Sequence, residues 1–125
     1  MPDQSGSPRQ DENTLQATLA ETNYSALVEK FLNDADVTLG SPGKKGFGSS
    51  ALQINNKIFA MLSQGRFIVK LPKQRVDELI ALGAGERFDP GHGRLMKEWL
   101  VVYSISQSEW LALAQEAKLF VAFAH

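Results

Sequence analysis

Hydrophobic residues alternate with polar ones through the middle of the chain, and this alternation predicts β-strands. Residues 51–71 contain three short runs of this kind, separated by the pairs Asn55-Asn56 and Gln64-Gly65. Period-two patterning is typical of strands with one buried face. Asparagine and glycine tolerate the positive φ angles of tight hairpin turns, so each pair suits a two-residue connection. The segment is therefore predicted to form a three-strand antiparallel meander.

Two further strands are predicted on either side of this meander. Val37 and Leu39 alternate around a polar residue, which is enough for a short strand before the glycine-rich loop at 40–50. Residues 96–103 alternate with apolar side chains on both faces, which is typical of a central strand or of one covered by a helix on each side. Residues 85–94, with the sequence GERFDPGHGR, are predicted to form a loop because glycine and proline interrupt them.

A first helix is predicted near the N-terminus. Residues 1–12 are rich in proline, serine, glycine and charged residues, so they bury too little apolar area to offset their ordering entropy. We expect them to be a disordered polar tail. Helical character begins near Asn13, and the better apolar stripe starts at Thr22 or Asn23, both good N-caps. This helix is expected to end near residues 33–34.

Two more helices follow in the second half. Pro72 suits the first turn of a helix, and Gly83 or Gly85 suits the left-handed residue that ends it. Residues 106–109, with the sequence SQSE, fit a capping box, in which serine and glutamate side chains satisfy free backbone N–H groups. Trp110 and Trp99 lie on periodic apolar faces, so both are expected in the core.

Together these elements predict an α+β fold class. The expected order is α-β-β-β-β-α-β-α, with an antiparallel sheet formed by the meander and one further strand, and with helices packed on it. The chain has 125 residues, so residues 13–125 are expected to form a single domain. No apolar run approaches the roughly 20 residues that span a bilayer, and the N-terminus has no signal-peptide core. We therefore expect a cytoplasmic protein without a membrane contact.

The residue content argues against several kinds of chemistry. There is no cysteine, which excludes thiolate metal sites and thiol nucleophiles, and the two histidines are few for a zinc site. The segment GSPGKKGFGSS has neither the order of a Walker loop nor the strand-to-helix setting of a dinucleotide loop. Asp89 and His92 could form an acid–base pair, but the surrounding proline and glycine favour a turn. We therefore expect no catalytic residue, no metal and no cofactor.

Positive charge is concentrated in the middle of the chain. Residues 44–97 contain ten lysine or arginine residues against four acidic ones, whereas residues 1–36 contain two against seven. A basic middle predicts an anion-binding face if the side chains converge, or internal neutralisation by the acidic flanks. The residues predicted to contact an anion or a nucleic acid are Lys44, Lys45, Lys73, Arg75, Arg87, His92, Arg94 and Lys97.

The order of these segments resembles the TfoX N-terminal domain family, small bacterial domains named after a competence regulator and related to YjbR-like small domains. The resemblance covers about residues 23–120. The matching pieces are Lys45 with Phe47-Gly48, Lys57 and Phe59, the junction 69–72, and residues 96–99. The family's usual Met-Phe-Gly-Gly segment differs here, because Gly46 replaces the methionine and Ser49 replaces the second glycine. The DPGHGR loop is typical of a stand-alone subgroup.

The resemblance implies an α+β fold without enzyme activity and a regulatory role. We therefore expect a non-catalytic binding or regulatory module that contacts a nucleic acid or an acidic protein partner. The contact would use the basic loop surface around Lys44-Lys45 and residues 87–97. The alternative is a small-molecule-binding protein or cryptic enzyme with a pocket between the glycine-rich loop and the DPGHGR loop. Asp89, His92 and Arg94 would be its polar groups.

Overall fold

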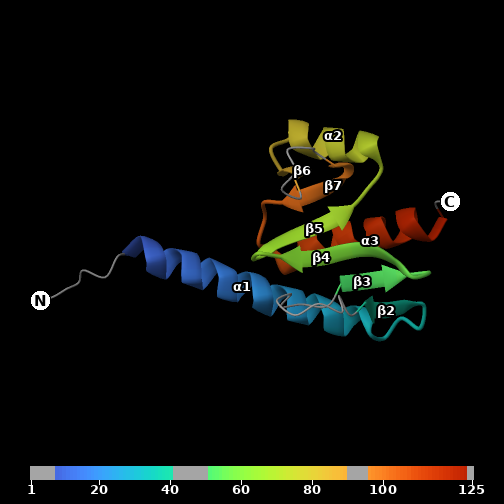
Figure 1. Cartoon of the computed structure of the whole chain (residues 1–125), viewed down its shortest axis with the longest axis horizontal. Helices are drawn as coiled ribbons and strands as arrows, with labels where there is room; N and C mark the ends of the chain where they lie inside the picture. Colours follow the sequence, from blue (N-terminus) through green and yellow to red (C-terminus); the bar gives the residue numbers. More distant parts are fainter. Residues whose placement is uncertain (1–7, 41–50, 90–95, 124–125) are drawn as a thin grey trace, which may run out of the picture.

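A computed structural model describes residues 8–40, 51–89 and 96–123, and the side chains from Leu19 onward within them. The elements are α1 (Pro8–Phe31), β2 (Val37–Gly40), β3 (Ala51–Ile54), β4 (Lys57–Ser63), β5 (Arg66–Lys70), α2 (Lys73–Ala81), β6 (Gly85–Phe88), β7 (Met96–Val102) and α3 (Gln107–Phe123). The described strands form one antiparallel sheet in the order β2-β3-β4-β5-β7-β6. The predicted α+β class is confirmed (Figure 1).

The predicted meander is confirmed, including both of its turns. Ile54 pairs with Lys57 and Ser63 pairs with Arg66, so two residues connect the strands each time. Positive φ angles occur at both residues of each turn, with 54° and 65° in the first and 54° and 75° in the second. These angles match the right-handed twist of the flanking strands, which is why asparagine and glycine residues set the register here.

Strand β6 corrects the prediction that residues 85–94 form a loop. Its four residues pair with β7 at the edge of the sheet, from Gly85 opposite Val102 to Phe88 opposite Met96. An edge strand needs only one hydrogen-bonded neighbour, so its sequence can contain the charged pair Glu86-Arg87 and show little alternation. As a result, β7 lies between β5 and β6, which confirms the first of the two predicted alternatives, a central strand.

Helix α1 begins earlier than predicted. Residues 8–12 belong to the helix rather than to a disordered tail, while residues 1–7 lie outside the described part. The interior of α1 contains Thr22 and Asn23, so neither is its N-cap. Asn23 is buried; its Nδ2 donates to the backbone oxygen of Ile105, and its Oδ1 accepts from Gln107 Nε2 at 3.0 Å. This side chain therefore ties α1 to the connection before α3.

The starts and ends of α2 and α3 follow the predicted signals in most details. Pro72 is the N-cap of α2, one position before its first turn, and Gly83 ends the helix with a φ of 78°. At α3, Ser106 Oγ accepts from Glu109 N–H at 3.3 Å, which confirms the serine half of the capping box. The N–H of Ser106 donates to Ser104 Oγ at 3.0 Å. None of the described helices is long and apolar enough to cross a membrane.

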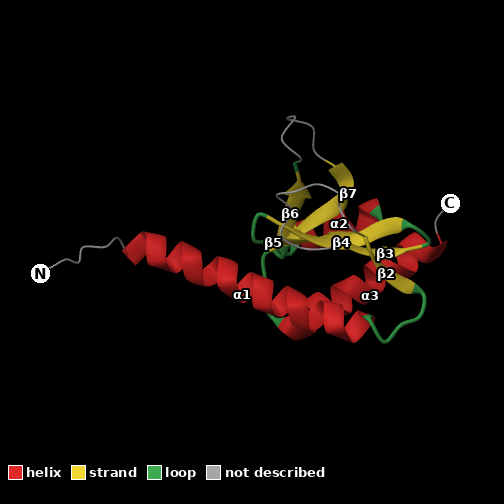
Figure 2. Cartoon of the chain, turned by 60° about the horizontal axis from the view of Figure 1, so that its bottom comes forward, coloured by secondary structure: helices red, strands yellow, loops and turns green. Residues whose placement is uncertain are grey.

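All three helices contribute to a core on one face of the sheet. Residues from α1, α2 and α3 join alternate strand residues such as Leu52, Phe67 and Leu100 in one buried cluster. Figures 1 and 2 show α1 and α3 beside the same face, with the N-terminal part of α1 extending beyond the sheet. The rings of Phe67 and Trp110 stack 4.3 Å apart at the centre. Burial of these apolar side chains is the main term that stabilises the fold.

Trp99 does not lie in this core, contrary to the prediction. It is only half-buried on the opposite face of the sheet, where Lys70 Nζ lies 5.7 Å from its ring centroid. Alternation places Trp99 and Leu100 on opposite faces, and Leu100 is the fully buried residue of the two. The apolar pattern on both faces of β7 therefore did not show which face receives the helices.

Candidate functional site

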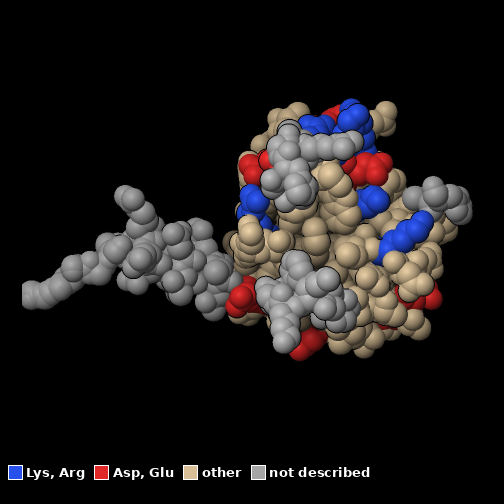
Figure 3. Space-filling view, viewed as in Figure 1, with Lys and Arg blue, Asp and Glu red and all other residues tan. Residues whose placement is uncertain are grey.

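The described members of the predicted basic set lie on three elements of the fold. Lys73 and Arg75 are on α2, Arg87 is on β6 and Lys97 is on β7. The other four members, Lys44, Lys45, His92 and Arg94, lie outside the described residues. Figure 3 shows basic side chains in separate groups on this face, with acidic side chains beside the group over α2. The described residues therefore do not form a continuous basic surface on this face.

Three of these four side chains are held in ion pairs. Lys73 Nζ lies 2.9 Å from Asp77 Oδ2, and Arg87 contacts the other oxygen of the same carboxylate. Arg75 binds Glu116 on α3 and Glu78 on its own helix. Lys97 is exposed, and no ion pair to it occurs within the described residues. Neutralisation by the acidic flanks, the predicted alternative, holds for Arg75 through Glu116, whereas Lys73 and Arg87 pair with Asp77 from within the basic segment.

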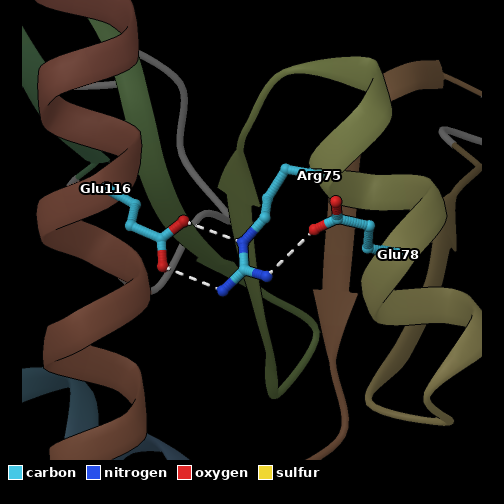
Figure 4. A network of polar contacts seen from close by, with 3 residues as sticks. All are labelled: Arg75, Glu78 and Glu116. Atoms are coloured by element: carbon cyan, nitrogen blue, oxygen red, sulfur yellow. Dashed lines mark hydrogen bonds and ion pairs between the residues drawn. The ribbon is translucent and has the colours of Figure 1, made fainter.

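Arg75 bridges α2 and α3. Its Nε donates to Glu116 Oε1 at 2.9 Å and its Nη2 donates to Glu116 Oε2 at 3.1 Å, as Figure 4 shows. Its Nη1 donates to Glu78 Oε1 at 3.3 Å. This bidentate contact to Glu116 raises the pKa of Arg75 above its usual range. Fork-shaped pairs of this kind have a defined geometry, so the bridge links the two helices at a specific point.

The loops predicted to form a pocket leave the sheet at different places. Residues 41–50 connect β2 to β3 at the end of the sheet where the β4–β5 turn lies, because Gly40 pairs with Ala51. Residues 90–95 connect β6 to β7 at the opposite end and at the other edge. Asp89 is exposed at the base of this second connection. The predicted pocket itself lies outside the described residues and stays a prediction.

A groove between α2 and α3 is the candidate site that the described residues support best. We call it the α2–α3 groove; its volume is about 560 Å³, and the C-terminal end of β7 forms its floor. Volumes of about 300–1,000 Å³ are usual for small-molecule sites. Its apolar lining consists of Leu79, Ala84, Val102, Ala112 and Leu113. The two helices cover different strands, α2 over β6 and β7 and α3 over β3 to β5, and small side chains leave the space between them open.

Few polar groups border this groove. The Arg75–Glu116 bridge borders it on the helices, and Glu109 and Ser104 add further polar atoms. Tyr103 separates it from a second groove; its hydroxyl donates to Glu86 at 2.9 Å, and this bond raises the pKa of Tyr103. An apolar surface with a few fixed polar groups can hold a ligand and orient it.

The second groove is smaller and more polar. It has a volume of about 440 Å³ and lies between Leu19 of α1, the β4–β5 turn and Ile105. The ion pair between Arg66 and Glu86, 3.1 Å apart, forms part of its wall. The two charges of that pair neutralise each other, and the smaller volume makes this groove the second candidate.

The α2–α3 groove was not predicted from the sequence. Its residues come from three separate stretches of the chain, 75–84, 102–104 and 109–116, and no local motif relates Leu79 to Ala112. Glu109 and Glu116 are seven residues apart, which places them on one side of α3 two turns apart. This spacing was the one signal that the sequence offered. Among the described residues, no three histidine or acidic side chains gather in an arrangement that could hold a metal ion.

Comparison with protein-family models, with curated proteins and with solved structures finds no match to this chain. The described geometry therefore supplies the grounds for a function.

Proposed function

We propose that this chain is a non-catalytic binding module and that its α2–α3 groove binds a small, largely apolar molecule. The groove is the observation that supports the proposal, because it combines a volume of about 560 Å³ with a mainly apolar lining. Burying a ligand's apolar surface there would contribute about 25 cal/mol per Å². A regulatory role of the TfoX N-terminal type, implied by the resemblance, is compatible with such a module and remains a prediction.

Contact with a nucleic acid or an acidic protein partner is the competing prediction. It would depend on Lys97 together with Lys44, Lys45, His92 and Arg94, since the other members of the predicted basic set are in ion pairs. Two results would favour this competitor. The association constant for DNA would fall with salt concentration with a log–log slope of several units, and DNA binding would be lost when both Lys44 and Lys45 are replaced by alanine.

Filling the groove should weaken ligand binding strongly without unfolding the protein. Ala112 is exposed on α3 and lines the groove, so in the substitution Ala112→Trp the indole would occupy the ligand's space. We expect the wild-type protein to bind 1-octanol saturably in ligand-observed NMR, and the variant to bind it at least about tenfold more weakly, because most of the apolar contact is lost.

A matched control separates blocking from a general effect of an added indole. Leu119 is exposed on α3, about 10 Å further along the helix axis than Ala112. Leu119→Trp should leave 1-octanol binding unchanged. Equal binding to the wild-type protein and to Ala112→Trp would overturn the proposal, and so would the absence of saturable binding to the wild-type protein.

A further inference from the structure

The charged side chains that line the α2–α3 groove are not balanced. Arg75 is the cation among its described lining residues, and it already binds Glu116 and Glu78. The guanidinium is therefore matched by two carboxylates before any ligand arrives. Glu109 is a third carboxylate, and its side chain has no ion pair or hydrogen bond within the described residues. The lining thus leaves an excess of negative charge.

Glu109 also lies where a ligand's charged end could reach it. It is the third residue of α3, and Ser106 Oγ holds its backbone N–H. Glu116 lies seven residues later, about 10 Å along the helix axis, where Arg75 covers it. Between the two glutamates, Ala112 and Leu113 present the apolar part of the lining. The groove therefore has an unpaired carboxylate at one end, an apolar middle and a neutralised ion pair at the other end.

We propose that the ligand of the α2–α3 groove is an organic cation with an apolar body, and that Glu109 binds its amine. This inference rests on the proposed function, because it names the chemistry of the ligand in the same groove. A bound ammonium group would donate to the Glu109 carboxylate, and the hydrocarbon would lie against Leu113 and Val102. An anionic ligand would instead meet the carboxylates of Glu109 and Glu116, with no uncommitted cation to bind it.

Three probes of equal chain length test the charge preference. Ligand-observed NMR would measure the affinities of 1-octylamine, 1-octanol and octanoate for the wild-type protein and for Glu109→Gln. The probes would be kept below the concentrations at which they aggregate. We expect 1-octylamine to bind the wild-type protein about fivefold more tightly than 1-octanol, as a partly exposed ion pair allows, and octanoate to bind most weakly. Raised salt should reduce the advantage of the amine.

The variants distinguish failure of this inference from failure of the proposed function. Glu109→Gln should remove the preference, so that the affinities of 1-octylamine and 1-octanol for this variant become equal. Glu29→Gln, which removes the same charge from an exposed position on α1, should change neither. If 1-octanol and 1-octylamine bind equally well to the wild-type protein, or if Glu109→Gln retains the preference for the amine, the inference is wrong. The groove would still be supported as the ligand site. If no probe binds, the proposed function fails as well.

Discussion

Replacing Trp110 with alanine should lower the free energy of unfolding by about 3–5 kcal/mol. Trp110 is 2% exposed, stacks on Phe67 at 4.3 Å, and its Nε1 donates to the backbone oxygen of Ser104 at 2.6 Å. The substitution removes a large apolar surface from the contact between α3 and the sheet and leaves a cavity there. It also leaves the Ser104 carbonyl without this donor. Chemical denaturation followed by far-UV circular dichroism measures the loss.

Trp99→Ala is the matched control for this measurement. The same residue type is removed, but Trp99 is half-buried on the opposite face of the sheet, where Lys70 lies over its ring. Its loss should be clearly smaller, because less apolar surface returns to water and no enclosed cavity forms. Equal losses for the two variants would show that the core does not lie on the helix-covered face.

Gly85→Ala should destabilise the protein by about 3 kcal/mol, at the upper end of the usual cost of overpacking. A Cβ atom at Gly85 would lie 2.2 Å from the backbone oxygen of Val101 and 2.9 Å from Leu100 Cδ1. The nearest atom belongs to the backbone of β7, so the strand itself would have to move. Thermal and chemical denaturation measure the effect, and a loss of amide protection along β6 would locate it.

Gly83→Ala provides the comparison two residues earlier. Gly83 has a φ of 78°, but a Cβ atom there would meet nothing within 4 Å. Its cost should be about 1–2 kcal/mol, from the left-handed backbone alone. A larger loss for Gly83→Ala than for Gly85→Ala would contradict the close packing of β6 on β7. From sequence, either glycine suited the left-handed end of α2, whereas in the structure Gly83 ends the helix and Gly85 packs against β7.

The local signals in the sequence predicted the parts of the fold that depend on neighbouring residues. The turns at Asn55-Asn56 and Gln64-Gly65 and the helix end at Gly83 require particular backbone angles, which few residue types adopt. Strand β6 could not be predicted this way, because the sequence GERF has no strand pattern of its own. It becomes a strand by pairing with β7. The full extent of α1 was missed for a similar reason, since its first half is polar and has no apolar stripe.

The candidate site was less predictable than the fold. A count of basic residues cannot show that Lys73 and Arg87 share Asp77, because the partners come from different elements. The groove depends on the angle and spacing of α2 and α3, and the Arg75–Glu116 bridge between these helices joins residues 41 positions apart in the sequence. Small side chains such as Ala84 and Ala112 appear unremarkable in a sequence, and only their arrangement leaves a groove between the helices.

Amide chemical-shift mapping with 1-octylamine tests the central claim most directly. A titration of the labelled protein should move the backbone amides of Gly83, Ala84, Ala112 and Leu113 most, because these residues line the α2–α3 groove. The largest shifts would saturate together with a single binding constant. Largest shifts at Gly65 and Ile105, which line the second groove, would contradict the assignment of the site. Shifts that do not saturate anywhere would contradict the existence of a ligand site.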